Sequence, residues 1–210
     1  MRGKQVVRRL GFFSAVLFAG LAQADVVFSN ITSPSSTAYP VLGSLFHGPL
    51  SMAAEFTPGA TFTLTDAEVR VFGLAGSQFD VVIASDGSAL PGSPIAQIGT
   101  DFAAPTALTG GIVTANSITT PITLTAGTHY WLVLSPARST SYIDWFAGGT
   151  QAVPLAQQSN GNWLSLPAGN VQFQIDGTTQ ASVPEPISGL SWGLAVSGLL
   201  PTEKARKRVR

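Results

Sequence analysis

Acidic side chains are the residues of this chain that are best spaced for catalysis. Asp66 and Glu68 lie two residues apart in a segment with strand-like alternation, so they should share one face, and we expect Glu55 on the strand beside them. Two carboxyl groups held roughly 5–10 Å apart across a cleft are the machinery of a glycoside hydrolase. Acids on the solvated face of a sheet have the same spacing, and we prefer that interpretation. We therefore predict no catalytic residue and no enzyme.

The sequence offers little for metal or nucleophilic chemistry. It contains no cysteine, and its two histidines, His47 and His129, lack the close spacing of metal ligands within one element. No motif of a serine hydrolase, a zinc protease or a phosphate-binding loop occurs. His129 precedes an apolar strand, where we expect a structural role. The segment SDGSALPG around Asp86 predicts a turn, with calcium binding as the alternative. We predict no metal and no cofactor.

Aromatic residues supply the candidate contacts to a carbohydrate. In the segment YIDWFAGG, Tyr142 and Asp144 alternate away from the apolar side chains between them, as on a strand with one exposed face. Exposed aromatic rings can stack on sugars, although most tryptophans of a β-sandwich lie in its core. Tyr142, Asp144 and Trp163 are the candidate glycan contacts.

These residues need strands to position them, and the sequence between the two ends predicts strands almost exclusively. The segment VQFQIDG alternates apolar and polar residues without a break, which is typical of a half-buried antiparallel strand. Turn-forming pairs such as Asn160-Gly161 recur between the apolar runs. The proline-rich stretch NITSPSSTAYP is expected to be a surface loop. We predict an all-β domain over residues 25–181, an antiparallel β-sandwich of jelly-roll-like type with about ten strands.

The basic residues of the chain are gathered at its two ends. Between residues 25 and 180 two arginines stand against nine acids, so this part carries a net charge of −7. Binding of nucleic acid is therefore disfavoured, because phosphates need a basic surface.

The amino terminus has the three parts of a secretory signal peptide. Four basic residues lie within the first nine positions, an apolar run covers residues 10–22, and Ala22 and Ala24 form a small-residue cleavage site. We predict a signal helix within residues 1–24, removed on export. The alternative, a membrane-spanning helix, is disfavoured because thirteen residues at about 1.5 Å each fall short of a ~30 Å hydrocarbon core.

The carboxyl terminus also combines an apolar run with a basic cluster, but here the apolar run comes first. Residues 187–200 form an apolar run, for which we predict a short helix of about 21 Å. Five of the last seven residues are basic, and such a cluster stays on the cytoplasmic side of a membrane. With an exported amino terminus, the expected topology places the β domain outside and the basic tail inside, so the chain contacts the membrane through this helix.

The order of these features resembles the PEP-CTERM sorting signal of Gram-negative bacteria. Residues 182–210 contain Val183 followed by Pro184, Glu185 and Pro186, then the apolar run and the basic cluster. The resemblance implies that a membrane-embedded exosortase recognises Pro184, Glu185 and Pro186 and cuts near them. The two prolines suit this role because they hold the segment extended and remove backbone donors. The alternative is a proline-rich linker before a plain tail anchor.

The domain itself is similar to the choice-of-anchor β domains that accompany this signal, through FTLTDAEVRVFGL, DGSALPG and LTAGTHYWLVLSP. This resemblance implies a fold and a location. The expectation is an exported, non-enzymatic protein of the cell envelope or extracellular matrix of a Gram-negative bacterium, at least transiently anchored in the membrane. Its expected partners are the export machinery, the exosortase and exopolysaccharide. The alternative is a secreted β-sandwich that binds or cleaves glycans.

Overall fold

A computed structural model describes residues 25–33, 37–43, 48–118 and 120–179. The chain divides after Gln180 into two units, and all described residues belong to the first. The predicted signal helix with Ala22 and Ala24, the sorting signal with Pro184, Glu185 and Pro186, the carboxyl-terminal helix and His47 therefore lie outside the described residues. Within the described residues, no helix is long and apolar enough to cross a membrane.

The described residues form strands and connecting turns, without a helix, so the predicted all-β class is confirmed. All strand pairs are antiparallel. The strands are β1 (Asp25–Ser29), β2 (Ala38–Leu42), β3 (Leu50–Phe56), β4 (Phe62–Gly73), β5 (Gln78–Asp86), β6 (Pro91–Ala103), β7 (Gly111–Ala115), β8 (Thr123–Leu124), β9 (Tyr130–Pro136), β10 (Tyr142–Phe146), β11 (Val153–Ser159), β12 (Asn162–Gly169) and β13 (Phe173–Thr179).

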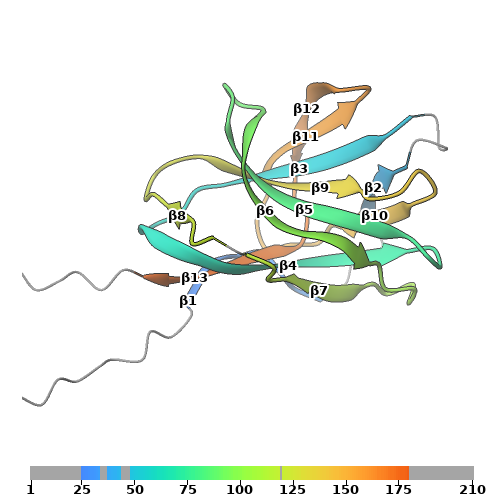
Figure 1. Cartoon of the computed structure of the whole chain (residues 1–210), viewed down its shortest axis with the longest axis horizontal. Coiled ribbons are helices and arrows are strands. Elements are labelled where there is room, and N and C mark those ends of the chain that lie inside the picture. Colours follow the sequence, from blue (N-terminus) through green and yellow to red (C-terminus); the bar gives the residue numbers. More distant parts are fainter. Residues whose placement is uncertain (1–24, 34–36, 44–47, 119, 180–210) are drawn as a thin grey trace, which may run out of the picture. The chain divides into compact units, whose positions relative to one another are not determined.

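The strands join into one curled sheet, which Figure 1 shows folding back on itself. Its main order is β1-β13-β4-β10-β2-β3-β9-β5-β6, while β7 and β8 pair with β4, and the β11–β12 hairpin joins β3 through β11. The link between the two halves is narrow, because β2 meets β3 at a single residue pair, Leu42 and Leu50. This arrangement brings the inner faces of β4, β10 and β13 against those of β3, β5 and β9.

Alternation along the strands produces the core between these faces. In β4 the buried positions include Phe62, Leu64, Ala67, Val69 and Val71, and the residues between them are less buried. Each large apolar side chain that is fully buried contributes about 1.5–3 kcal/mol, so such strands hold the sheet together. Trp145 is also fully buried, and its indole nitrogen donates a hydrogen bond to the carbonyl of residue 172.

β2 differs from the expectation of a surface loop. Residues 38–42 pair along their whole length with β10, and Pro40 lies opposite Asp144. Proline fits here because the other edge of β2 is paired only at its end, through Leu42, so the missing N–H interrupts no ladder. The proline-rich composition pointed to a loop, and the long-range pairing with β10 overrides it.

A buried polar group ties the end of β1 to the loop before β11. Asn30 is fully buried, and its side-chain nitrogen donates to the carbonyls of Gln151 and Val171 at 2.8 and 2.9 Å. Its side-chain oxygen accepts from the hydroxyl of Thr150 and the backbone N–H of Gln151. Gln172, predicted on the polar side of the last strand, is likewise fully buried and donates to the carbonyls of residues 33 and 147. These side-chain amides form hydrogen bonds with backbone groups that are not paired within the sheet. They take the place that water would otherwise fill.

Candidate functional site

The outer face of the second half of the sheet carries its own apolar cluster. Since Met52 and Ala54 point into the core, Ala53 between them points outward. The pairing register places Ala53 beside Val133 of β9 and Ala156 of β11, and Val133 beside Val82 of β5. The buried members of this outer cluster are Ala53, Ala84, Trp131, Val133 and Ala156.

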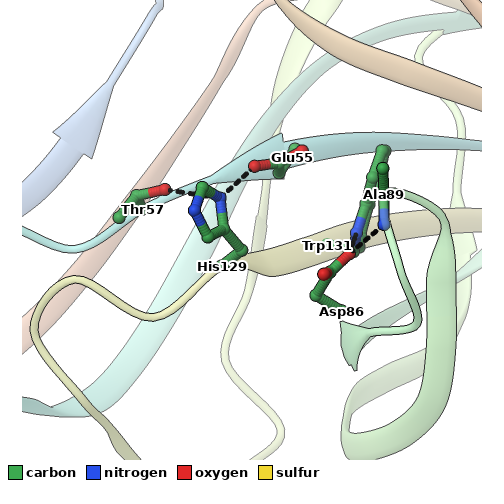
Figure 2. A network of polar contacts seen from close by, with 6 residues as sticks. All are labelled: Glu55, Thr57, Asp86, Ala89, His129 and Trp131. Carbon is green, nitrogen blue, oxygen red and sulfur yellow. Dashed lines mark hydrogen bonds and ion pairs between the residues drawn. The ribbon is translucent and has the colours of Figure 1, made fainter.

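The turn after β5 closes over this cluster. Asp86 Oδ1 accepts a hydrogen bond from the indole nitrogen of Trp131 at 3.1 Å and one from the backbone N–H of Ala89 at 3.0 Å (Figure 2). Ser88 and Ala89 have φ values of 71° and 66°, a backbone conformation that needs such support. Leu90 packs against the outer cluster, and Trp131 is fully buried. Asp86 therefore holds the turn in place through these two hydrogen bonds. Among the described residues, no group of three or more acidic or histidine side chains is placed to hold a metal ion.

Between this turn and the β11–β12 hairpin lies a groove of about 220 Å³. β5 and β9 contribute strand residues of the outer face, the start of β6 contributes Pro91, Gly92 and Pro94, and the hairpin contributes Gln158 and Trp163. Trp163 is half-buried, since one part of its side chain packs on the outer cluster. The residues lining the groove are Val82, Ala84, Pro91, Gly92, Pro94, Val133, Ser135, Gln158 and Trp163.

The other two candidate glycan contacts lie elsewhere. Tyr142 and Asp144 belong to β10, which pairs with β2 and β4, and neither lines the groove. They interact with each other: burial raises the pKa of Asp144, and the hydrogen bond from Tyr142 opposes that rise. Burial, and then the negative charge of Asp144, raise the pKa of Tyr142. Among the three candidates, the structure pairs Tyr142 with Asp144 and places Trp163 in a separate site.

Glu55 also departs from its expected position. β3 is flanked by β2, β9 and β11, whereas Asp66 and Glu68 lie on β4, so the expectation of neighbouring strands is wrong. The carboxylate of Glu55 instead contacts Nδ1 of His129, and the hydroxyl oxygen of Thr57 lies 3.2 Å from the same nitrogen (Figure 2). A catalytic triad needs the acid and the nucleophile on opposite ring nitrogens. This arrangement instead ties the turn after β3 to the start of β9, in keeping with the structural role expected for His129.

The acids of β4 meet a partner that is distant in sequence. Asp66 and Glu68 share one face, as predicted, and the register places Asp66 opposite Asp176 of β13. Gln174 donates from Nε2 to both carboxylate oxygens of Asp176 at 3.0 Å. Burial raises the pKa of Asp176 to about 6; the hydrogen bond from Gln174 opposes this, and Asp66 and Glu68 add to it. None of these acids lines the groove or the cavities of about 590 and 250 Å³.

Sequence reasoning missed the groove and the pairing of Asp66 with Asp176. Both depend on strand register over long distances, because the groove gathers residues from β5, β6, β9, β11 and β12. The one local signal was the turn pair Asn160-Gly161, with φ values of 51° and 83°, which fixes the register that places Trp163 opposite Gln158.

Comparison of the chain with protein-family models, with curated proteins and with solved structures finds no match.

Proposed function

We propose that this chain is an exported, non-enzymatic protein of the cell envelope or extracellular matrix, sorted through its carboxyl-terminal signal by an exosortase and associated with exopolysaccharide. The observation that carries the proposal is the order of Pro184-Glu185-Pro186, apolar run and basic cluster near one end of the chain, with the residue pattern of a signal peptide at the other end. Among the described residues, the last strand, β13, ends at Thr179, three positions before the predicted signal over residues 182–210. The proposal includes jelly-roll-like connections, which the antiparallel pairing and the crossed strand order support.

A non-enzymatic role is supported by how the candidate catalytic groups are engaged. Glu55 and Thr57 line the cavity of about 250 Å³, where Glu55 is the single carboxyl group, and both meet the same nitrogen of His129. Asp66 faces Asp176 across two paired strands, and neither lines that cavity, the groove or the cavity of about 590 Å³. Carboxyl groups that cleave a glycosidic bond must flank an open cleft. A structural use of these side chains explains their contacts.

The alternative of carbohydrate binding is favoured by one observation, the groove beside Trp163. It is compatible with the main proposal, since a matrix protein can bind glycans without cleaving them. The glycan-cleaving form of this alternative predicts that hydrolysis of polysaccharide is lost in Glu55→Gln or Glu68→Gln. If the chain hydrolysed polysaccharide in a saturable manner and either substitution abolished the activity, the non-enzymatic proposal would fail.

Sorting can be tested by following the chain in a Gram-negative host that contains an exosortase. An epitope placed at Leu108, which is 82% exposed in the loop before β7, leaves the strands and the groove intact. We expect the wild-type chain to shorten and to reach the envelope or medium, and Glu185→Ala to block both changes. Glu203→Ala removes the other acid of the tail and is the matched control, which should behave as wild type. Unchanged size and location of the Glu185→Ala chain would refute the proposal.

A further inference from the structure

We propose that the groove between the turn after β5 and the β11–β12 hairpin binds one uncharged hexose ring of a polysaccharide, with the ring stacked on Trp163. This inference rests on the proposed association with exopolysaccharide and gives it a site and a ligand class. Four observations carry it: the shape of the groove, its aromatic side chain, its unused polar groups and its lack of charge.

The size of the groove fits one sugar ring. Its volume of about 220 Å³ lies below the roughly 300–1,000 Å³ of pockets for drug-sized ligands. The groove is also preformed on one side, because Asp86 fixes the turn to Trp131 and the backbone N–H of Gly87 bonds the carbonyl of Leu90 at 2.7 Å. A Cβ added at Gly92 would lie 2.7 Å from the hydroxyl oxygen of Ser85, so the chain packs closely there. Such preorganisation lowers the entropic cost of binding a small ligand.

The lining of the groove combines an aromatic ring with hydrogen-bonding groups, and a sugar needs both. A hexose ring presents C–H groups on its faces and hydroxyl groups around its edge, so it needs an aromatic plane and hydrogen-bonding groups together. Trp163 provides the half-exposed aromatic ring. Among the described residues, the hydroxyl of Ser135 makes no hydrogen bond, and Gln158 uses only Nε2, in a long contact of 3.4 Å to the carbonyl of Gly161. The Ser135 hydroxyl and the Gln158 carbonyl oxygen are therefore open to ligand hydroxyl groups.

The charge distribution selects an uncharged sugar. No residue that lines the groove is charged. The nearest acids by register are Asp80, which lies opposite Ser135, and Asp86, which is bonded to Trp131. With a net charge of −7 over residues 25–180 and no basic side chain in the groove, a uronic acid would be repelled. An uncharged hexose meets no such penalty.

The test uses the full chain in a detergent that has no sugar headgroup, with a neutral glucan, a neutral galactan and a polyuronate as probes. Trp131 and Trp145 are fully buried, so Trp163 is the accessible tryptophan of the described residues. We expect a neutral glycan to protect tryptophan fluorescence from acrylamide quenching in a saturable manner, and the polyuronate to have no effect. Isothermal titration, which does not depend on the tryptophan, should show that Trp163→Ala weakens binding by about tenfold or more, as for a central aromatic contact. Trp163→Tyr should retain most of the affinity.

Leu164→Ala is the matched control, because this neighbouring side chain is 62% exposed and does not line the groove. It should bind as wild type, and far-ultraviolet circular dichroism should show that all variants are folded. Gln158→Ala, followed by isothermal titration, tests the polar contact separately and should weaken binding by about fivefold.

Three results would overturn the inference: no binding of either neutral glycan, equal binding of the polyuronate, or unchanged affinity in Trp163→Ala. Each of these can occur while Glu185→Ala still blocks sorting, in which case the sorting proposal stands and the groove assignment falls. Conversely, if the chain binds a neutral glycan as expected and Glu185→Ala is sorted normally, the groove assignment stands and the proposed sorting by an exosortase is rejected.

Discussion

Replacement of Asp176 by asparagine should stabilise the β domain at neutral pH. Asp176 retains only 9% of its exposure and faces Asp66 and Glu68, so its ionised form is disfavoured in the folded chain. Its pKa is about 6 in the folded state and near 3.8 in the unfolded chain. Because the folded state binds the proton more tightly, protonation favours folding at low pH. This contribution is fully present below about pH 3.8 and is lost as the pH rises through about 6.

The size of the effect follows from the two pKa values. At about 1.36 kcal/mol for each pH unit between them, the full difference is roughly 3 kcal/mol. Solvent at the outer face of the sheet screens the charge, which reduces the expected effect to about 1–2 kcal/mol. Asparagine has a similar shape and keeps a carbonyl oxygen that can accept from Gln174 Nε2, so one of the two hydrogen bonds survives. Its amide can donate to Asp66, where the charged carboxylate cannot.

Urea unfolding at pH 4.0, 5.0, 6.0 and 7.5, followed by tryptophan fluorescence, measures this contribution. We expect Asp176→Asn to raise the free energy of unfolding at pH 7.5 by about 1–2 kcal/mol and to leave it nearly unchanged at pH 4.0. Asp25→Asn removes an exposed acid from the neighbouring strand β1 and controls for net charge. It should follow the wild-type profile between pH 4.0 and 7.5.

Two results would refute this reasoning. One is a difference in the free energy of unfolding between the wild-type chain and the Asp176→Asn variant that is the same at every pH. The other is a carboxyl resonance of Asp176 that titrates near its ordinary value in carbon-13 spectra. A destabilised variant at pH 7.5 would mean that the lost hydrogen bond from Gln174 outweighs the relief of repulsion.

Three further substitutions test other contacts by urea unfolding at pH 7.5. Asn30→Ala should lower the free energy of unfolding by about 3 kcal/mol, because it removes the partners of the carbonyl and N–H of Gln151 and of the carbonyl of the buried Val171. Asp86→Ala should cost about 1–2 kcal/mol, since the buried indole N–H of Trp131 loses its acceptor, and it should also weaken glycan binding. His129→Ala should change the free energy of unfolding by less than about 1 kcal/mol, because 57% of the side chain is exposed. A larger loss would contradict the small contribution expected for the exposed contacts of His129 with Glu55 and Thr57.

The strands of this domain were predictable where one face is apolar. β13 and β4 alternate apolar and polar residues, and both lie where the sequence places them. β2 was not predictable, because proline is disfavoured within a strand and β2 contains Pro40. The strand forms because it pairs with β10, which is distant in the sequence. The alternation of the segment VQFQIDG also concealed a difference: Gln172, just before β13, and Asp176 within it have polar side chains, yet both are buried. A period-two pattern identifies the core face and does not reveal what covers the other face.

The candidate site required knowledge of register rather than of residue type. Trp163 was recognised as a candidate, but Ser135 and Gln158 have no special feature in the sequence, and they join it only because the β11–β12 hairpin and β9 flank β3. Asp66 and Asp176 likewise become a pair through one cross-strand register, 110 positions apart in the chain. Sequence spacing detects neighbours within an element, whereas these sites join elements that are distant in the sequence.

The charge pattern constrains how the domain would associate with the polysaccharide matrix of our proposal. The basic residues gather in the two terminal segments that our proposal assigns to export and sorting, and the part between them carries a charge of −7. If both segments are removed, the released domain has two arginines against nine acids, so anionic polysaccharides are repelled over most of its surface. Attachment to an anionic polysaccharide by general electrostatic attraction is then disfavoured, and attachment would rely on uncharged contacts that act at short range. The groove beside Trp163 offers contacts of this kind, which is why glycan binding should change little with ionic strength.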